Sequence, residues 1–294
     1  MIRVYTVVQK ELFATDVSSQ KEMDDLAGKF KRAWVDCSDL NDEETMIASR
    51  LLGVDATTLD GIENGNVRPS YAKCLDEECS YYTWISTPVV EFAGELKLNP
   101  FSIILKERFL ITLRTRYSSR IIESALRAFS ALEPQERKPS VILSKLLHKI
   151  IDENSGAMVS IRGLIDKIEE AALENPRKKI ITQSIFKLKR GLATLYNLLW
   201  AEKELLSDMN LGTIRHLKLS LEAKLIVDDA MDDVTRELEF VDSFDRSLDS
   251  VLRLQDLGAI HRVETNLVIL TAALVIMNVI LILLDSHIID ILFG

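Results

Sequence analysis

Residues 267–284 read LVILTAALVIMNVILILL, and this stretch decides how the rest of the chain is organised. These 18 residues carry no charge. At about 1.5 Å of rise per residue they form roughly 27 Å of helix, which is close to the thickness of a bilayer core. Ten residues follow, fewer than the roughly 20 that a return span needs. We therefore expect a single transmembrane helix at residues 263–286, followed by a short outer tail at 287–294.

Basic residues flank this stretch on one side only. Arg253, His261 and Arg262 precede it, whereas Asp285 and Asp290 follow it and no Lys or Arg does. Cytoplasmic flanks of membrane helices are enriched in Lys and Arg. We therefore expect a single-pass protein of the inner or plasma membrane, with its large N-terminal part in the cytoplasm.

Polar residues recur at every seventh position along the span. The polar series is Glu264, Thr271, Asn278 and Asp285, and the apolar series offset from it is Leu267, Leu274, Leu281 and Ile288. A period of seven keeps one face of a helix toward partner helices. The amide of Asn278 is also costly to leave in lipid without a partner. The pattern therefore predicts self-association.

Two interpretations of this polar series are open. Copies packed around an axis would line a pore, in which Thr271 and Asn278 offer oxygens to a passing cation and Asp285 lies at the outer mouth. Alternatively, the same groups form hydrogen bonds between helices that fix their register.

Three long runs of helical periodicity precede the span. The first two cover residues 143–175 and 181–199. The third begins near Thr213 and meets no Pro before the end of the chain. One helix longer than about 100 Å is therefore expected to continue into the membrane. We assign residues 137–262 to a long-helix funnel or stalk domain.

Residues 1–136 mix short apolar runs with helical ones and predict an α/β or α+β domain. Strands are expected at 2–8, 33–36, 81–85, 101–104 and 109–113, the last two forming a hairpin, and helices at 42–52 and 57–63. The fold class of the chain is therefore α+β, with an N-terminal α/β domain, a long-helix funnel domain and a single C-terminal transmembrane helix.

Four acids lie close together in the third helical run: Asp228, Asp229, Asp232 and Asp233. Like charges one turn apart are mildly destabilising unless a cation or solvent relieves them. Carboxylate oxygens are the ligands that hard divalent cations prefer. A cation site and a solvated acidic face are both compatible with the pattern.

The overall charge excludes some partners. The chain has 45 acidic and 36 basic residues, a formal net charge of -9 and no basic block. Nucleic acid is therefore not an expected partner, and divalent cations are a better electrostatic match. The sequence has no Gly-rich phosphate loop, no GxSxG elbow and no HExxH motif, so we expect no enzyme.

Several motifs, taken in their order, resemble the CorA family of magnesium and cobalt channels. They are Trp34-Val35-Asp36 followed by DLNDEE, GVDATTLDGIENGNVRP, FSIILKERFLIT, LSKLLHKIIDE, DDAMDD and ETNLVILTAAL. The resemblance implies a homopentamer whose first membrane helix lines the pore. It also implies that intracellular Mg²⁺, bound between subunits, holds the channel closed. Divalent cations (Mg²⁺ or Co²⁺), lipid and further copies of the chain are the expected partners.

The resemblance also assigns roles to residues. Asp229 matches the helix carboxylate of the regulatory metal site, and Asp228 and Asp232 are its acidic neighbours. On the other side of this regulatory site, the family has a second Asp. The matching position in this chain is Gly61, and the adjacent Asp60 is the candidate ligand. On the membrane helix, the expected pore-lining set is Glu264, Leu267, Thr271, Leu274, Asn278, Leu281 and Asp285.

The chain departs from the family pattern at the outer end of the span. The family's Gly-Met-Asn signature would fall at residues 288–290, which read Ile-Ile-Asp, and Met277-Asn278 is preceded by Ile276. The family's second membrane helix is not expected either. The first hypothesis is a divergent divalent-cation channel, and the alternative is a non-conducting pentameric sensor or interaction scaffold. A soluble enzyme tethered by one anchor is less favoured, because no site chemistry supports it.

Overall fold

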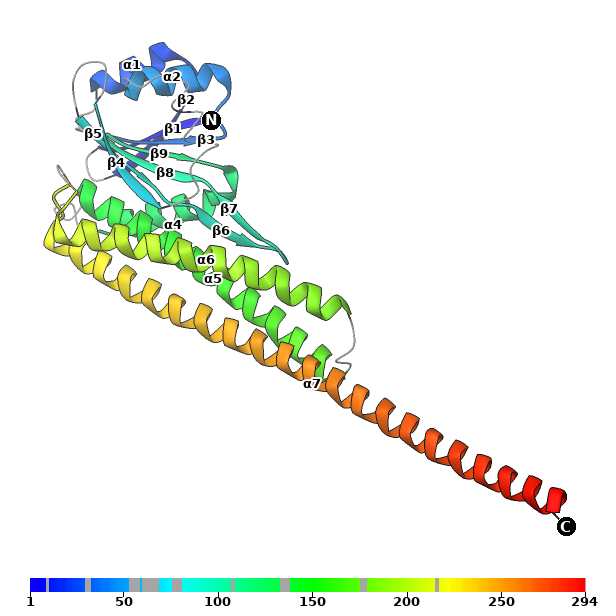
Figure 1. Ribbon diagram of the computed structural model, residues 1–294. Helices are drawn as coiled ribbons and strands as arrows, with labels where there is room; N and C mark the ends of the chain where they lie inside the picture. Colours follow the sequence, from blue (N-terminus) through cyan, green and yellow to red (C-terminus); the bar gives the residue numbers. More distant parts are fainter. Residues whose placement is uncertain are drawn as a thin grey trace. The chain divides into compact units, whose positions relative to one another are not determined.

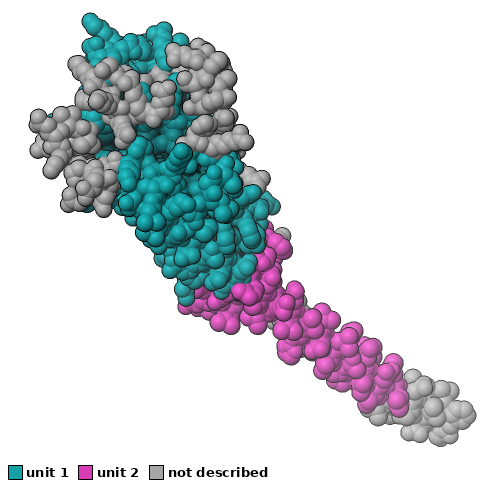
Figure 2. All heavy atoms as spheres, turned by 90° about the vertical axis from the view of Figure 1, so that its left-hand side faces the viewer, with its two compact units in different colours: residues 1–164, 190–243 teal, residues 165–189, 244–294 magenta. Residues whose placement is uncertain are grey.

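A computed structural model describes most of the chain: residues 1–8, 11–29, 33–52, 59, 69–75, 81–106, 109–132, 138–174, 179–214 and 217–293. The chain divides into two compact units (Figure 2). Residues 1–164 with 190–243 form the first unit, and residues 165–189 with 244–294 form the second. The first unit holds the β-sheets, whereas the second is built from parts of the long helices.

A seven-stranded sheet lies at the centre of the N-terminal region (Figure 1). In spatial order its strands are β2 (Glu11–Val17), β1 (Ile2–Val8), β3 (Ala33–Ser38), β9 (Phe109–Arg114), β8 (Phe101–Lys106), β5 (Tyr81–Ser86) and β4 (Ser70–Leu75). All neighbours are antiparallel except β3 and β9, which are parallel. A separate two-stranded sheet pairs β6 (Val89–Phe92) with β7 (Leu96–Asn99).

The predicted strands are confirmed, as is the hairpin. Strand β8 pairs with β9 from Phe101 opposite Arg114 to Lys106 opposite Phe109. The register buries the apolar runs of both strands. Buried strands favour β-branched and aromatic residues, and these residues were the basis of the prediction.

Helices cover both faces of the large sheet (Figure 1). On one face lie α1 (Gln20–Lys29) and α2 (Asp42–Leu52), and Met23, Ile47 and Ala48 from these helices join the core formed by the strands. On the other face lies α4 (Ser119–Ser130), which follows the short 3₁₀ helix η1 (Arg116–Ser118). The predicted helix at 42–52 is confirmed. The one expected at 57–63 lies outside the described residues apart from Leu59, which is helical and buried.

A buried ion pair joins β3 to β9. Arg114 donates from Nε to Asp36 Oδ1 at 2.9 Å and from Nη2 to Asp36 Oδ2 at 2.7 Å. The two side chains are only 5% and 2% exposed. The Thr112 hydroxyl donates to Asp36 at 2.7 Å and accepts the indole N–H of Trp34 at 3.1 Å. The bidentate geometry and these further hydrogen bonds compensate the burial of both charges.

Three long helices follow the sheet region, as predicted: α5 (Pro139–Glu174), α6 (Lys179–Leu211) and α7 (Leu221–Phe293). In the second unit, Lys189 of α6 lies 2.7 Å from Asp245 and 2.8 Å from Asp249 of α7. Also within this unit, the Thr182 hydroxyl donates to the amide oxygen of Gln255 at 2.9 Å. Hydrogen bonds to the two aspartates raise the pKa of Lys189.

The third helix begins later than the sequence predicts. We expected it to start near Thr213, but α6 ends at Leu211 and α7 starts at Leu221. Gly212 adopts φ 73°, which favours glycine, and the Thr213 amide bonds back to Asp208 O at 3.1 Å, so this segment closes α6. The Ser220 hydroxyl then accepts the Ala223 amide at 3.3 Å and caps the start of α7.

Helix α7 contains the predicted membrane span. It has 73 residues, which corresponds to a length of about 110 Å, and Gly258 does not interrupt it. Among the described residues it is the one helix that is long and apolar enough to cross a membrane. Its most apolar 18-residue window is not buried by any other part of the chain. The expected α+β class with one C-terminal membrane-type helix is thus confirmed.

Candidate metal site and membrane helix

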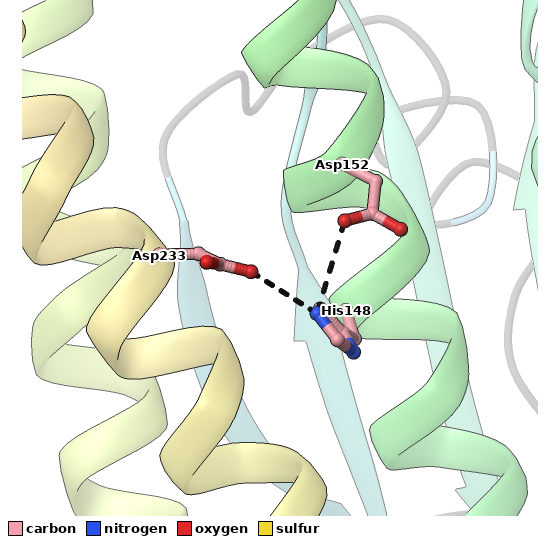
Figure 3. Close-up of side chains that lie close together, drawn as sticks. All are labelled: His148, Asp152 and Asp233. Carbon is pink, nitrogen blue, oxygen red and sulfur yellow. Dashed lines mark hydrogen bonds and ion pairs between the residues drawn. The ribbon is translucent and has the colours of Figure 1, made fainter.

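Three side chains that could hold a metal ion converge from two helices (Figure 3). His148 and Asp152 lie one turn apart on α5, and Asp233 reaches toward them from α7. His148 Nε2 is 3.1 Å from Asp233 Oδ2 and 3.8 Å from Asp152 Oδ1. One ligand atom from each residue lies within 4.8 Å of the others. The cluster therefore offers one imidazole nitrogen and two carboxylate oxygens to a shared point.

Helical periodicity places these residues at the edge of the packed surface. Leu147 and Ile151 of α5 are buried, so the next residue along the chain in each case, His148 and Asp152, lies at the rim. Val234 of α7 is fully buried, and Asp233 precedes it. The three ligand side chains are partly exposed, so an ion and its water molecules can reach them.

Two basic side chains balance the cluster's carboxylates. Lys149 Nζ lies 2.5 Å from Asp152 Oδ2, and Arg236 forms an ion pair with Asp233. A divalent cation would have to displace or share these contacts. An imidazole ligand favours ions such as Co²⁺ or Zn²⁺, whereas Mg²⁺ prefers oxygen ligands alone, so the donor set suits borderline divalent ions best.

The acids predicted as metal ligands lie in different surroundings. Asp228 is half-buried and accepts a hydrogen bond from Asn210 Nδ2 at 2.6 Å. Asp229 and Asp232 are exposed on α7. Asp60 lies outside the described residues. The cluster instead uses Asp233, the fourth acid of the same run, and the metal-binding role of the other four residues stays a prediction.

Sequence reasoning overlooked His148 and Asp152. In the sequence, the α5 segment was assigned only by the periodicity of its apolar residues. The sequence did contain a signal, because His148 and Asp152 are four residues apart and each follows an apolar residue of the helical pattern. Residues with this spacing lie on the same face of a helix.

Two buried carboxyl groups lie on the same three-helix region, in the first unit. Glu202 of α6 is 2% exposed, and burial raises its pKa to about 8, with a further rise from the charge of Glu237. Glu237 of α7 is 3% exposed, and burial raises its pKa to about 7. The Ser155 hydroxyl donates to Glu237 and opposes this rise, whereas the charge of Asp233 adds to it.

The residues predicted to line a pore are accessible on the single chain. Six of them are exposed on α7: Glu264, Leu267, Thr271, Leu274, Asn278 and Leu281. The Thr271 hydroxyl donates to Leu267 O at 2.8 Å within the helix, which leaves its oxygen lone pairs as acceptors. For Asp285 the structure describes only the helical backbone. Their facing a pore stays a prediction.

Solved structures share this fold at low sequence identity. The soluble domain of CorA from Methanocaldococcus jannaschii matches with a TM-score of 0.67 and 18% identity, over 87% of this chain and 96% of that one. The complete CorA magnesium transporter from the same organism matches with a TM-score of 0.70 and 16% identity, over 90% and 79%. The ZntB cytoplasmic domain from Vibrio parahaemolyticus matches with a TM-score of 0.60 and 15% identity, over 89% and 98%.

The chain has a sheet domain followed by three long helices, and the last helix contains a membrane-type segment. This architecture is that of a membrane protein with a large domain outside the bilayer. The sequence from residue 31 to residue 279 matches the family model of the CorA-like Mg²⁺ transporter protein, and the chain belongs to this family. The resemblance found in the sequence motifs is thereby confirmed. Among curated proteins, none is detectably similar to this chain in sequence.

Proposed function

We propose that this chain is the subunit of a homopentameric divalent-cation channel whose pore is lined by the membrane part of α7. Mg²⁺ and Co²⁺ are the expected transported ions. The N-terminal part lies in the cytoplasm, and intracellular Mg²⁺ binding holds the channel closed. The chain is therefore expected to move ions and to catalyse no reaction.

The observation that carries this proposal is the continuity of α7. One helix bears Asp233 of the metal cluster near its start and the polar series of the span further along. The residues that could hold an ion and the residues that would line the pore therefore belong to one continuous helix, which supports coupling between ion binding and the pore.

The membrane segment supports conduction through its accessible polar groups. Asn278 and Thr271 provide oxygen acceptors on a face that repeats every seven residues. Rings of neutral oxygens hold hydrated Mg²⁺ loosely, which permits passage, and rings of Leu267, Leu274 and Leu281 would close the path by excluding water.

Ion uptake into proteoliposomes tests conduction. Wild-type protein reconstituted with a Mg²⁺-sensitive dye inside the vesicles is expected to admit Mg²⁺, whereas Asn278→Leu is expected to lose most of the flux. Met277→Leu is the matched control, because it changes the adjacent side chain and leaves the polar series intact. Oligomer mass is measured in the same detergent, so that lost assembly is not mistaken for lost conduction.

The regulatory site is tested in the same vesicles by varying Mg²⁺ on the cytoplasmic side. Asp229→Ala is expected to leave the channel open at Mg²⁺ concentrations that close the wild type. His148→Gln tests whether the cluster of Figure 3 contributes to closure. Closure that persists in both variants would place the sensor elsewhere.

A second function is favoured by one feature of the sequence. Residues 276–278 read Ile-Met-Asn and residues 288–290 read Ile-Ile-Asp, where the family resemblance implies Gly-Met-Asn. A non-conducting pentameric sensor or interaction scaffold would need no selectivity signature. Absence of uptake by a pentamer of verified mass would support this alternative over the channel.

A further inference from the structure

Two carboxyl groups lie in the core of the helical region at positions that helical periodicity reserves for apolar residues. Glu202 falls between Leu198 and Leu205 on the buried face of α6, and Glu237 follows Val234 on the buried face of α7. Both side chains are almost completely inaccessible to solvent. Such positions carry a charge only when it is paired.

Each carboxyl group is hydrogen-bonded through one oxygen only. Glu202 Oε1 accepts from the Thr87 hydroxyl at 3.0 Å and from Asn154 Nδ2 at 3.1 Å. Glu237 Oε1 accepts from the Ser155 hydroxyl. The second oxygen of each, Oε2, is buried and has no hydrogen-bond partner among the described residues.

The charged groups around the pair do not neutralise it. Burial raises the pKa of Glu202 most, and the charge of Glu237 adds to this rise. Glu237 is influenced by Asp233 and Arg236 on its own helix and by Asp152 of α5. Arg236 is the one cation among these groups; its side chain is 60% exposed and is already paired with Asp233. Two carboxylates in this core would therefore leave a large uncompensated charge.

We propose that Glu202 and Glu237 form a proton-binding site, in which the pair shares one proton taken from solvent. This proton removes one negative charge from the core and gives one of the two unpartnered oxygens an O–H group. Two buried carboxyl groups whose charges repel do not both ionise. The raised pKa of both residues agrees with this arrangement.

The shared proton stabilises the contact of the helices with the sheet region. Thr87 lies between β5 and β6, and Asn154 accepts the backbone N–H of Val90 in β6 at 2.8 Å. Glu202 thus connects α6 to α5 and to the segment around β6. When the pH rises and the proton leaves, repulsion between two buried carboxylates weakens this contact.

Infrared spectroscopy and thermal unfolding of the full-length protein in detergent test the site between pH 6 and pH 10. The variants are Glu202→Gln, Glu237→Gln and the double variant, and the control is Glu239→Gln at an exposed position of α7. We expect the wild type and the control to show a protonated carboxyl C=O band that disappears above about pH 8. Each single variant should lose the band at a lower pH than the wild type, and the double variant should lack it. The wild-type Tm is expected to fall by roughly 5 °C between pH 6.5 and pH 9, and that of Glu202→Gln by less than half as much.

Three results would overturn the proposal. The first is a wild type without a protonated carboxyl band at neutral pH, and the second is a band that persists in the double variant. The third is a stabilisation by millimolar Mg²⁺ at pH 9 that requires Glu202, because it would make a metal ion the occupant. If the double variant does not fold, the two single variants decide, since each should lose the band at a lower pH than the wild type.

Discussion

The buried charges of the sheet region and those of the helical region are accommodated in opposite ways. In the sheet, Asp36 is paired with Arg114 through two hydrogen bonds and receives a third from Thr112. In the helices, Glu202 and Glu237 have hydroxyl and amide donors but no dedicated cation. The difference indicates that a guanidinium can compensate the charge of a buried carboxyl group, and where no guanidinium faces the group we propose a proton in that role.

The largest effect is expected from breaking the compensated pair. Arg114→Met leaves the Asp36 carboxylate buried without a counter-ion, and loss of one partner of a buried pair costs about 3–5 kcal/mol of unfolding free energy. Denaturant unfolding of the full chain measures it. Arg116→Met is the matched control, because Arg116 is 83% exposed and pairs with Asp39 at the surface. Equal losses in both variants would show that burial does not decide the strength of the pair.

The opposite change is expected in the helices. Replacing both Glu202 and Glu237 by Leu removes uncompensated buried carboxyl groups and is expected to raise the free energy of unfolding at pH 9 by about 1–4 kcal/mol. The folded-state pKa values of about 8 and about 7 lie above the ordinary glutamate value. The wild type therefore loses stability as the pH rises toward about 8, whereas the double variant should not. A double variant that is less stable than the wild type at pH 9 would contradict this comparison.

The metal cluster represents an intermediate case, because its carboxylates are partly exposed and are paired with Lys149 and Arg236. Co²⁺ at ten times its Kd is expected to stabilise the wild type by about 1.4 kcal/mol, and Asp233→Asn should abolish this gain. Thermal shift with and without Co²⁺ measures it. Glu239→Gln is the control, because Glu239 is exposed on the same helix and lies outside the cluster.

The smallest effect is expected at the surface of the sheet. Arg3 pairs with Asp16 across β1 and β2, and both side chains are exposed. Arg3→Gln should cost no more than about 1 kcal/mol, and this loss should disappear in high salt. A cost that approaches that of Arg114→Met would mean that exposure does not separate the two pairs.

Much of the fold was predictable because it depends on local periodicity. Alternating and β-branched runs gave the strands, and apolar spacing gave the three long helices. The late start of α7 was missed because apolar spacing does not show where a helix ends or is capped. Here Gly212 ends α6 in a left-handed conformation, and Ser220 caps the start of α7. The parallel pairing of β3 with β9 joins segments about 75 residues apart, and no local pattern specifies it.

The candidate site was predictable only in part. The acidic run of α7 drew attention to Asp233, but His148 and Asp152 belong to another helix, and only packing brings the two helices together. Glu202 and Glu237 interrupt apolar series in which a charged residue is unusual. These interruptions of the apolar pattern were visible in the sequence, and they indicate buried ionisable groups. A count of the charged residues does not reveal such groups.

Trp34 in the sheet region and Trp200 in the helices lie in different surroundings, so their fluorescence should distinguish the two regions. Trp34 is buried in contact with Tyr5, and its indole is tied to the hydroxyl that bonds Asp36. Trp200 on α6 is 49% exposed, with Lys203 Nζ 5.7 Å from its ring centroid. A buried indole emits at shorter wavelength than one in water. Loosening of the sheet should therefore shift the fluorescence of Trp34 to the red while that of Trp200 changes little, so the chain contains its own reporter for the sheet region.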